Sequence, residues 1–490
     1  MQPRPTQGSP TKRGPSGRAA SGLPTNVARA LARAAATTDG SSIPPEVRDR
    51  ATDLILDTVA VVASASADAQ WQSLAAILRG PVGTSTLVGD PKPVAPATAA
   101  LLNAAATTIE QLADGHRRAR GHPAAHVVPA AFAVAEAADV SGEAFLAAVV
   151  AGYEVAARIG IALGGTRPGI HDVGTWAVVG AATAVAHLRS RGDEASIWRA
   201  IEGSAGLTLR PPEAALEAGA PVHHLAAGLG VHAGLIAGEA AVAGFDPVPG
   251  SLETFLGPGI GDRFDPANLV DGIEGGRWDR FEILHGYVKF HPTTAHAHGA
   301  NDAIEDLMAT ESLTPEEILG IDVRTYAAAA RLAAALPANG FAARFSIPWS
   351  VAAAIVTRGL GPEAFSPERL ADPVTIALAR LVRVRSDAEH ESGYPAGRPT
   401  TVEIRLRDGR RLRAVSIAPR GDAANPVPRS ALHAKAHRLL CGRFGVTASE
   451  AVVGSALAIG RGTARPSDLG AALRNAAAGG LGGGSLAMSS

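Results

Sequence analysis

The stretch SGEAFLAAVVAGYEVAARIG, residues 141–160, indicates the fold class more directly than any other part of the chain. Its apolar residues recur at helical spacing and cover nearly every side of the predicted helix. Ser141, followed by Glu143 and Ala144, is typical of a helix start. A helix that is apolar nearly all round is stable only when it is buried against other helices. The stretch therefore predicts the core helix of an all-α bundle.

Neighbouring segments extend this pattern, and a later segment departs from it. Residues 44–66 and 175–192 are also Ala- and Val-rich with helical spacing, and RSRGD (189–193) is a plausible helix stop. From about Glu282 strand signals appear, first in EILGIDVRTY (317–326). Residues 401–418 alternate on both sides of Asp408-Gly409, a dipeptide that a two-residue hairpin turn prefers.

These patterns predict a mainly α protein with a large all-helical domain and a smaller α+β lid domain. Both ends of the chain are rich in Gly, Ser or Pro and are predicted to be disordered tails. The predicted division is a tail at 1–24, the helical domain at 25–270 and 423–475, the lid at 271–422, and a tail at 476–490.

Composition limits the classes of partner and site. The chain has 490 residues, 46% hydrophobic and 19% charged, with a formal net charge of −1, which argues against nucleic acid or an anionic membrane as the main partner. Cys441 is the single cysteine, which excludes an intrachain disulfide and Cys-rich metal sites and favours the cytoplasm. The longest apolar run is broken by Glu154 and Arg158, so no membrane span is predicted.

Three histidines, His116, His122 and His126, lie within residues 112–132. Pro123 biases His122 away from helix, and Pro129 is expected to interrupt any long helix through His126. A zinc pair on a firm helix is therefore not favoured, and neither a metal nor a cofactor is predicted. His122 stands at a junction between a loop and an apolar helix. That place suits an acid or base facing a cleft, whereas a packing position suits His126.

The segment from residue 103 to 160 resembles the signature region of the MmgE/PrpD family, which includes 2-methylcitrate dehydratase, cis-aconitate decarboxylase and iminodisuccinate epimerase. Further blocks resemble the family in the same order, and together the resemblance spans roughly residues 27 to 460. These blocks are GIHDVGTWAVVGAATAVAHL (169–188), GAPVHHLAAGLGVHAGLIAGEAAVAGF (219–245), VKFHPTTAHAHGANDAI (288–304), ARFSIPWSVAAAIV (343–356) and the hairpin and helix of 399–440.

The resemblance implies a helical domain with an α+β lid, a homodimer, and a metal-free active site between the domains for small polycarboxylates. It implies catalytic roles for His122 and His298, joined by Glu110 or Asp114 in place of the family's first aspartate. It also implies substrate binding by His171, Lys289, His223 and His116. His223 stands where the family has a lysine, and Gly115 or His116 stands where it has a threonine. Thr294 and Ala295 replace the lid cysteine and its neighbour.

A histidine at position 223 is charged only in part near neutral pH, so it holds a carboxylate less firmly than lysine does. Arg117, Arg118 and Arg120 are either replacement cations or a solvated basic loop, and a cleft role is considered for His224 as well. His296 lies two residues before His298, so the two would face one side of an extended segment and diverge in a helix. Three functions follow from the resemblance: a lyase, an epimerase or isomerase, and a non-catalytic relative.

Overall fold

The core helix predicted from residues 141–160 is α6, Gly142–Leu163. Its start is confirmed, because the Ser141 hydroxyl accepts the backbone N–H of Ala144 at 3.2 Å. Its charged pair, Glu154 and Arg158, forms an ion pair inside the protein and is completely buried. The helix packs against α7 (Ala177–Ser190) and α5 (Pro123–Ala137), which are also buried along most of their length.

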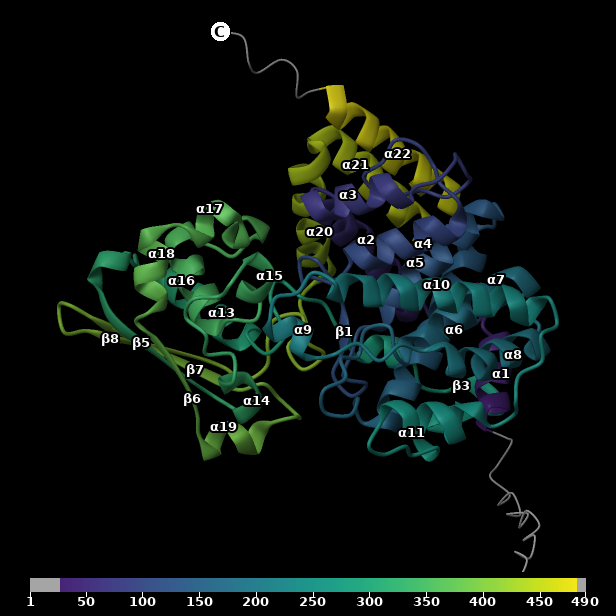
Figure 1. Ribbon diagram of the computed structural model, residues 1–490, viewed down its shortest axis with the longest axis horizontal. Helices are drawn as coiled ribbons and strands as arrows, with labels where there is room; N and C mark the ends of the chain where they lie inside the picture. The colour runs from purple at the N-terminus through teal and green to yellow at the C-terminus, as the bar shows by residue number, and fades with distance from the viewer. Residues whose placement is uncertain (1–26, 483–490) are drawn as a thin grey trace, which may run out of the picture.

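The structure, a computed structural model, describes residues 27–482. Most of it is a bundle of helices that contains both ends of the described chain, with α1 and α22 at opposite ends of this lobe (Figure 1). The remaining helices of this bundle are α1 (Val27–Ala36), α2 (Pro45–Ala65), α3 (Ala69–Leu78), α4 (Pro96–Ala106), α8 (Glu194–Ser204), α9 (Ala214–Glu217), α10 (His223–Val242), α11 (Gly257–Ile260), α12 (Ala267–Val270), α20 (Arg429–Phe444), α21 (Val446–Gly460) and α22 (Pro466–Gly482).

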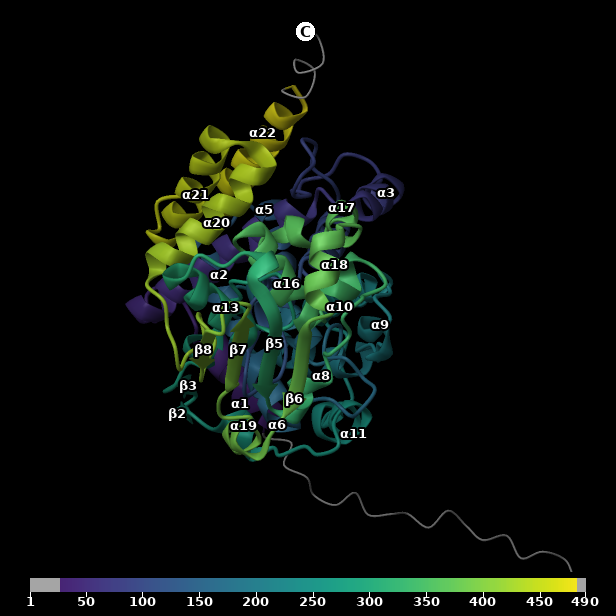
Figure 2. The same cartoon turned by 90° about the vertical axis from the view of Figure 1, so that its left-hand side faces the viewer.

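A second lobe holds a four-stranded sheet, whose strands lie side by side in the order β6-β5-β7-β8 (Figure 2). The strands are β5 (Ile318–Thr325), β6 (Val382–Ser386), β7 (Thr400–Leu406) and β8 (Arg411–Ser416). Strands β7 and β8 confirm the predicted hairpin, although its turn occupies residues 407–410 and not the two-residue Asp408-Gly409 alone. The helices of this lobe are α13 (His298–Thr310), α14 (Ala327–Ala330), α15 (Gly340–Ala343), α16 (Ile347–Thr357), α17 (Pro367–Leu370), α18 (Pro373–Ala379) and α19 (Ala388–Gly393).

Each lobe has its own hydrophobic core, and the cores show where the chain crosses between them. The lid core runs from Ala297 to Leu406, whereas Trp278, Ile283 and Val288 pack in the core of the bundle. The crossing therefore lies near residue 291, and the predicted boundary at 271 is about twenty residues too early. Short strands explain the difference, because β2 (Ile273–Glu274) and β3 (Arg277–Trp278) pair with each other and not with the lid sheet.

Helix α22 extends to Gly482, so it overlaps the tail predicted from residue 476. The rest of that tail and all of the tail predicted at 1–24 lie outside the described residues. Two helices, α6 and α10, are long and apolar enough by composition to cross a membrane, a test that the core helices of globular domains also pass. Helix α6 is 94% buried within the fold, as the core helix of a globular domain is.

A two-residue ladder fixes the loop in front of α5. Strand β1 (Gly115–His116) pairs antiparallel with β4 (Gly286–Tyr287), so the loop that leads to His122 lies beside the chain that leads to Lys289. Helix α5 itself continues through Pro129, contrary to the predicted interruption. Proline inside a helix costs about 3 kcal/mol, but nearly every residue of α5 is buried, and this packing compensates for the missing hydrogen bond.

Candidate active site

A cavity of about 690 Å³ lies between the bundle and the lid, and both contribute to its walls. From the bundle and its loops come Arg120, His122, His171 and Asp172, together with Glu213 beside α9. Tyr287 and Lys289 come from the crossing segment, and Arg398 comes from the lid. A cleft between domains with convergent polar groups is a common place for a binding site.

His122 is the residue that precedes α5, and its backbone is not helical, as Pro123 predicted. Its Nδ1 lies 2.9 Å from Oδ2 of Asp172, a carboxylate that is itself buried. The Asp172 carboxylate accepts a hydrogen bond from the Nδ1–H group of His122, which leaves the lone pair of Nε2 available to take a proton. The pair is therefore built like the base and orienting acid of a general-base site.

The charge state of Asp172 agrees with this role. Burial alone would raise the pKa of Asp172, but the charges of His122 and His171 and the hydrogen bond from His122 hold the pKa below its usual range. His171 lies on the other side of the carboxylate, with its Nδ1 3.4 Å from Oδ1. Burial lowers the pKa of His171, and the neighbouring Asp172 carboxylate opposes the decrease.

A glycine is required at position 121, directly before His122. A Cβ on this residue would lie 2.4 Å from Oδ2 of Asp172 and 2.4 Å from Cζ2 of Trp176. Those distances are far inside van der Waals contact, and neither atom belongs to the free end of an exposed side chain. The contact between His122 and Asp172 therefore depends on the missing side chain of Gly121.

The structure separates the two acidic alternatives, Glu110 and Asp114. Asp114 accepts the N–H groups of Ala124 and Ala125, each at 3.2 Å, so it caps the helix that His122 precedes. Burial raises the pKa of Asp114 to about 6, and the nearby charge of His122 opposes the rise. Glu110 instead accepts the hydroxyl of Ser64 at 2.9 Å. Neither carboxylate lines the cavity. Asp114 therefore positions His122 by holding the start of α5 from outside the cavity.

Lys289 and Arg398 supply positive charge to the cavity. Lys289 is buried, and burial together with the charge of Arg398 lowers the pKa of Lys289 to about 7. The Arg398 guanidinium lies over the Tyr287 ring, 5.1 Å from its centroid. Its buried Nε has no hydrogen-bond partner among residues 27–482. A guanidinium with a buried, unused donor is suited to bind a carboxylate.

The three arginines of the basic loop predicted as a source of cations fall into two groups. Arg117 and Arg120 line the cavity, and Arg117 also forms an ion pair with Asp422 and a hydrogen bond to the Ala396 carbonyl. Arg118 does not line it; its Nη1 lies 3.1 Å from Glu282. The alternative of a uniformly solvated loop is therefore wrong for Arg117, which is mostly buried.

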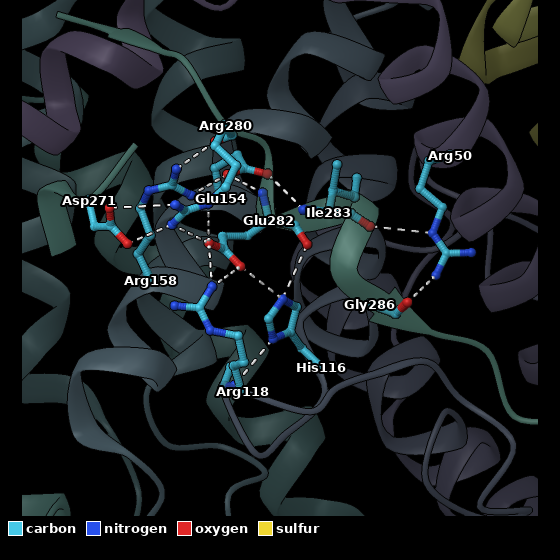
Figure 3. A network of polar contacts seen from close by, with 11 residues as sticks. Arg50, His116, Arg118, Glu154, Arg158, Asp271, Arg280, Glu282, Ile283 and Gly286 are labelled. Carbon is cyan, nitrogen blue, oxygen red and sulfur yellow. Dashed lines mark hydrogen bonds and ion pairs between the residues drawn. The ribbon is translucent and has the colours of Figure 1, made fainter. Parts of the chain in front are cut away.

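His116 belongs to a buried ionic network and not to the cavity wall, which corrects the predicted substrate contact (Figure 3). Its Nε2 lies 3.3 Å from Oε2 of Glu282 and 3.2 Å from the carbonyl of the same residue. Arg118 and Arg280 bind this carboxylate as well, and the backbone of Glu282 donates to Glu154 at 2.9 Å. The network fastens the 115–121 loop to α6.

His223 and His298, both predicted to contact substrate or to act on it, are buried and do not line the cavity. The His223 ring centroid lies 4.7 Å from that of His171, and neither ring nitrogen has a hydrogen-bond partner among the described residues. Burial and the neighbouring His171 and His224 lower the pKa of His223 to about 2, so it supplies no cation. The Nε2 of His298 lies 3.3 Å from the Thr293 carbonyl, inside the lid.

His296 lines the cavity in place of His298, with its Nδ1 2.7 Å from the Tyr326 hydroxyl. Helix α13 begins at His298 and turns that ring away. Thr294 and Ala295 also line the cavity, whereas His224 lies beside Thr108, 2.8 Å from its hydroxyl. Sequence reasoning missed Asp172, Tyr287 and Arg398. Only Asp172 left a signal, since it follows His171 directly in GIHDVGTW.

Comparison with known proteins decides the family. Residues 29–255 match the MmgE/PrpD N-terminal domain, and residues 291–457 match the MmgE/PrpD C-terminal domain. The chain belongs to the MmgE/PrpD family. The predicted resemblance is thus confirmed, and the mainly α fold with a smaller α+β domain agrees with it.

A curated relative in this family is a cis-aconitate decarboxylase-like protein of Aspergillus oryzae. It is 29% identical over 288 residues, which cover 54% of this chain. The match spans 58% of the relative's own length. The family includes dehydratases and decarboxylases, and the relative's name falls in the second group.

Proposed function

We propose that this MmgE/PrpD protein is a metal-independent lyase that acts on a small di- or tricarboxylate, as a hydro-lyase or a decarboxylase. One observation carries the proposal: the His122–Asp172 pair lies on the wall of a cavity that also holds Lys289 and Arg398. A proton-transferring pair beside two cations is what chemistry at a carbon next to a carboxylate requires.

In a dehydration, Nε2 of His122 takes the proton from the carbon next to a carboxylate. The electron pair forms the double bond, and hydroxide leaves from the neighbouring carbon with a proton from Lys289, forming water. In a decarboxylation, the bond to the carboxyl carbon breaks, and the electron pair remains on the substrate. Carbon dioxide leaves, and protonated His122 delivers its proton to the substrate carbon that had carried the carboxyl group. Arg398 and Lys289 balance the negative charge that develops in either reaction.

An epimerase is the second candidate, and Glu213 favours it. Glu213 lines the same cavity and accepts the Gly169 N–H at 3.3 Å, so a second base is present besides His122. Removal of a proton by one base and its return by the other inverts a carbon centre. A non-catalytic relative would need neither base, and the intact His122–Asp172 pair argues against it.

The single free cysteine supports our further proposal of a cytoplasmic protein.

Turnover in heavy water tests the proposal. The purified chain is incubated with cis-aconitate, citrate and 2-methylcitrate, and products are followed by proton NMR. A lyase releases carbon dioxide or water, whereas an epimerase exchanges deuterium into recovered, inverted substrate. His122→Gln should lower kcat by about 10²–10⁴-fold. His232→Gln, on α10 away from the cavity, is the matched control and should keep full activity. Equal activity of the two variants would contradict the proposal.

A further inference from the structure

One wall of the cavity is apolar, in contrast to the parts of the cavity that carry positive charge. This wall consists of one lid segment and a residue of α9, namely Ala328, Leu332, Leu336, Pro337, Phe345 and Leu216. Arg331 is the charged side chain that the same segment brings to the cavity. The histidines and the cations Lys289 and Arg398 come from other segments, whereas Arg331 lies within the apolar wall segment itself.

Hydrogen bonds to both lobes hold the apolar wall in place. Asn339 donates from its side chain to the Gly219 carbonyl at 2.9 Å, which ties the lid segment to the end of α9. The carbonyl of Leu332 accepts the N–H of Ile347 at 3.0 Å, and that of Ala334 accepts the Ser346 hydroxyl at 2.5 Å. The wall is therefore a built surface, ordered by contacts outside itself.

The size of the cavity exceeds what a bare polycarboxylate needs. Its volume of about 690 Å³ lies within the range of roughly 300–1,000 Å³ that drug-sized ligands occupy. A substrate with six carbons and three carboxylates has only a few CH or CH2 groups to set against six apolar residues. Leu336 lines the cavity while it is 51% exposed, so the wall reaches the protein surface.

We propose that the apolar wall binds an alkyl group of several carbons that is attached to the skeleton of the carboxylate substrate. The inference rests on the proposed function, because the charged half of the cavity holds the carboxylates. The alkyl group lies along Leu332 and Phe345, and a longer chain passes Leu336 toward solvent. The preferred substrate is therefore an alkyl-substituted di- or tricarboxylate, not the unsubstituted acid.

Calorimetric titration with succinate and its 2-methyl, 2-butyl and 2-hexyl derivatives tests this inference. Each methylene removed from water should tighten binding by about fourfold, which corresponds to about 0.8 kcal/mol. The Kd should therefore fall steadily from succinate to 2-hexylsuccinate. If all four acids bind with the same Kd, the inference is overturned and the proposed function stands. Binding of none of the four acids would overturn both.

Variants of the wall locate the effect. Leu336→Ser and Leu332→Ser should each reduce the ratio of the succinate Kd to the 2-hexylsuccinate Kd by about fourfold or more. Leu319→Ser is the matched control, because Leu319 is a 46% exposed leucine of β5 outside the cavity. It should keep the ratio of the unmodified protein. A ratio unchanged in both wall variants would show that the alkyl group binds elsewhere, which overturns the inference.

Discussion

At the scale of single residues, the arrangement of His122 depends on what lies behind it. Asp172 fixes the ring through Nδ1, and Asp114 caps the helix that starts beside it. The sequence pointed to His122 through Pro123 and to Asp114 as one of two alternatives. It could not show Asp172 as the partner of His122, because a contact across 50 residues is set by the packing of α5 against α7 and not by local pattern.

Asp172→Asn should lower kcat severely while the fold is kept. An amide in place of the carboxylate can donate a hydrogen bond to Nδ1, which leaves the proton on Nε2 and removes the base. The same change in a Ser-His-Asp triad costs on the order of 10⁴-fold in kcat. Steady-state kinetics measure the loss, and a circular dichroism spectrum like that of the unmodified protein shows that the fold remains. A rise in KM with an unchanged kcat would instead indicate that Asp172 binds substrate directly.

The binding of carboxylates should weaken as pH rises through about 7. Burial and Arg398 lower the pKa of Lys289 to about 7, so its cation is present below that pH and is lost above it. The unfolded chain keeps this proton up to its ordinary pKa of about 10.4, so this group makes the free protein more stable as pH rises between the two values. The Kd of succinate, measured from pH 6 to 9, should increase. Lys289→Met should flatten the profile, and a profile that keeps its slope would exclude Lys289 as the group responsible.

At the scale of elements, α5 and the 115–121 loop show which structural features local sequence patterns can predict and which they cannot. Helix α5 was predicted from its apolar run, but its passage through Pro129 depends on burial that no local rule describes. The role of His116 was misjudged for the same reason. Its partner, Glu282, approaches from a distant segment through the β1–β4 ladder, which is only two residues long.

Glu282→Gln should loosen this loop. Burial would raise the pKa of Glu282, but the hydrogen bond with His116 and the charge of Arg118 hold it at about 2. Loss of one partner from a buried ionic network costs about 3–5 kcal/mol, so the melting temperature should fall. The stabilisation is present above the unfolded pKa of about 4.3 and is lost as pH falls toward 2.

Thermal melts between pH 3 and 7 check this prediction. The difference between the unmodified protein and Glu282→Gln should be largest at pH 7 and should shrink on acidification. Glu253→Gln is the matched control, since Glu253 lies outside the network and has no ion pair with a described residue. A melting difference that is independent of pH would contradict an ionic role for Glu282.

At the scale of the whole molecule, the order of the sequence blocks that resemble the family predicted the fold. The boundary between the two domains depends on which hydrophobic core each segment packs in. Residues 273–290 were assigned to the predicted lid, yet their apolar side chains pack in the bundle core. Arg398 could not be predicted at all, because it reaches the cavity only when the lid lies against the bundle. Each half of the site was thus predicted in part, because His122 and Lys289 were found from the sequence whereas their partners Asp172 and Arg398 were not.

We propose that the protein forms a homodimer through α10. Val222, Leu229 and Ile236 recur at seven-residue spacing along this helix and are 62%, 46% and 49% exposed. Apolar stripes of this kind mark interfaces. Light scattering should give the mass of two chains, and Leu229→Lys with Ile236→Lys should give one. Leu319→Lys in the lid, a control of similar exposure, should stay dimeric, and a monomeric unmodified protein would contradict the proposal.

A crystal structure with citrate soaked into the cavity would show whether the cavity is the active site. Citrate carboxylates should contact Lys289 and Arg398, and a methylene carbon next to a carboxylate should face Nε2 of His122 while Nδ1 remains bound to Asp172. Citrate bound elsewhere, or a His122 ring turned away from both Asp172 and the ligand, would contradict it.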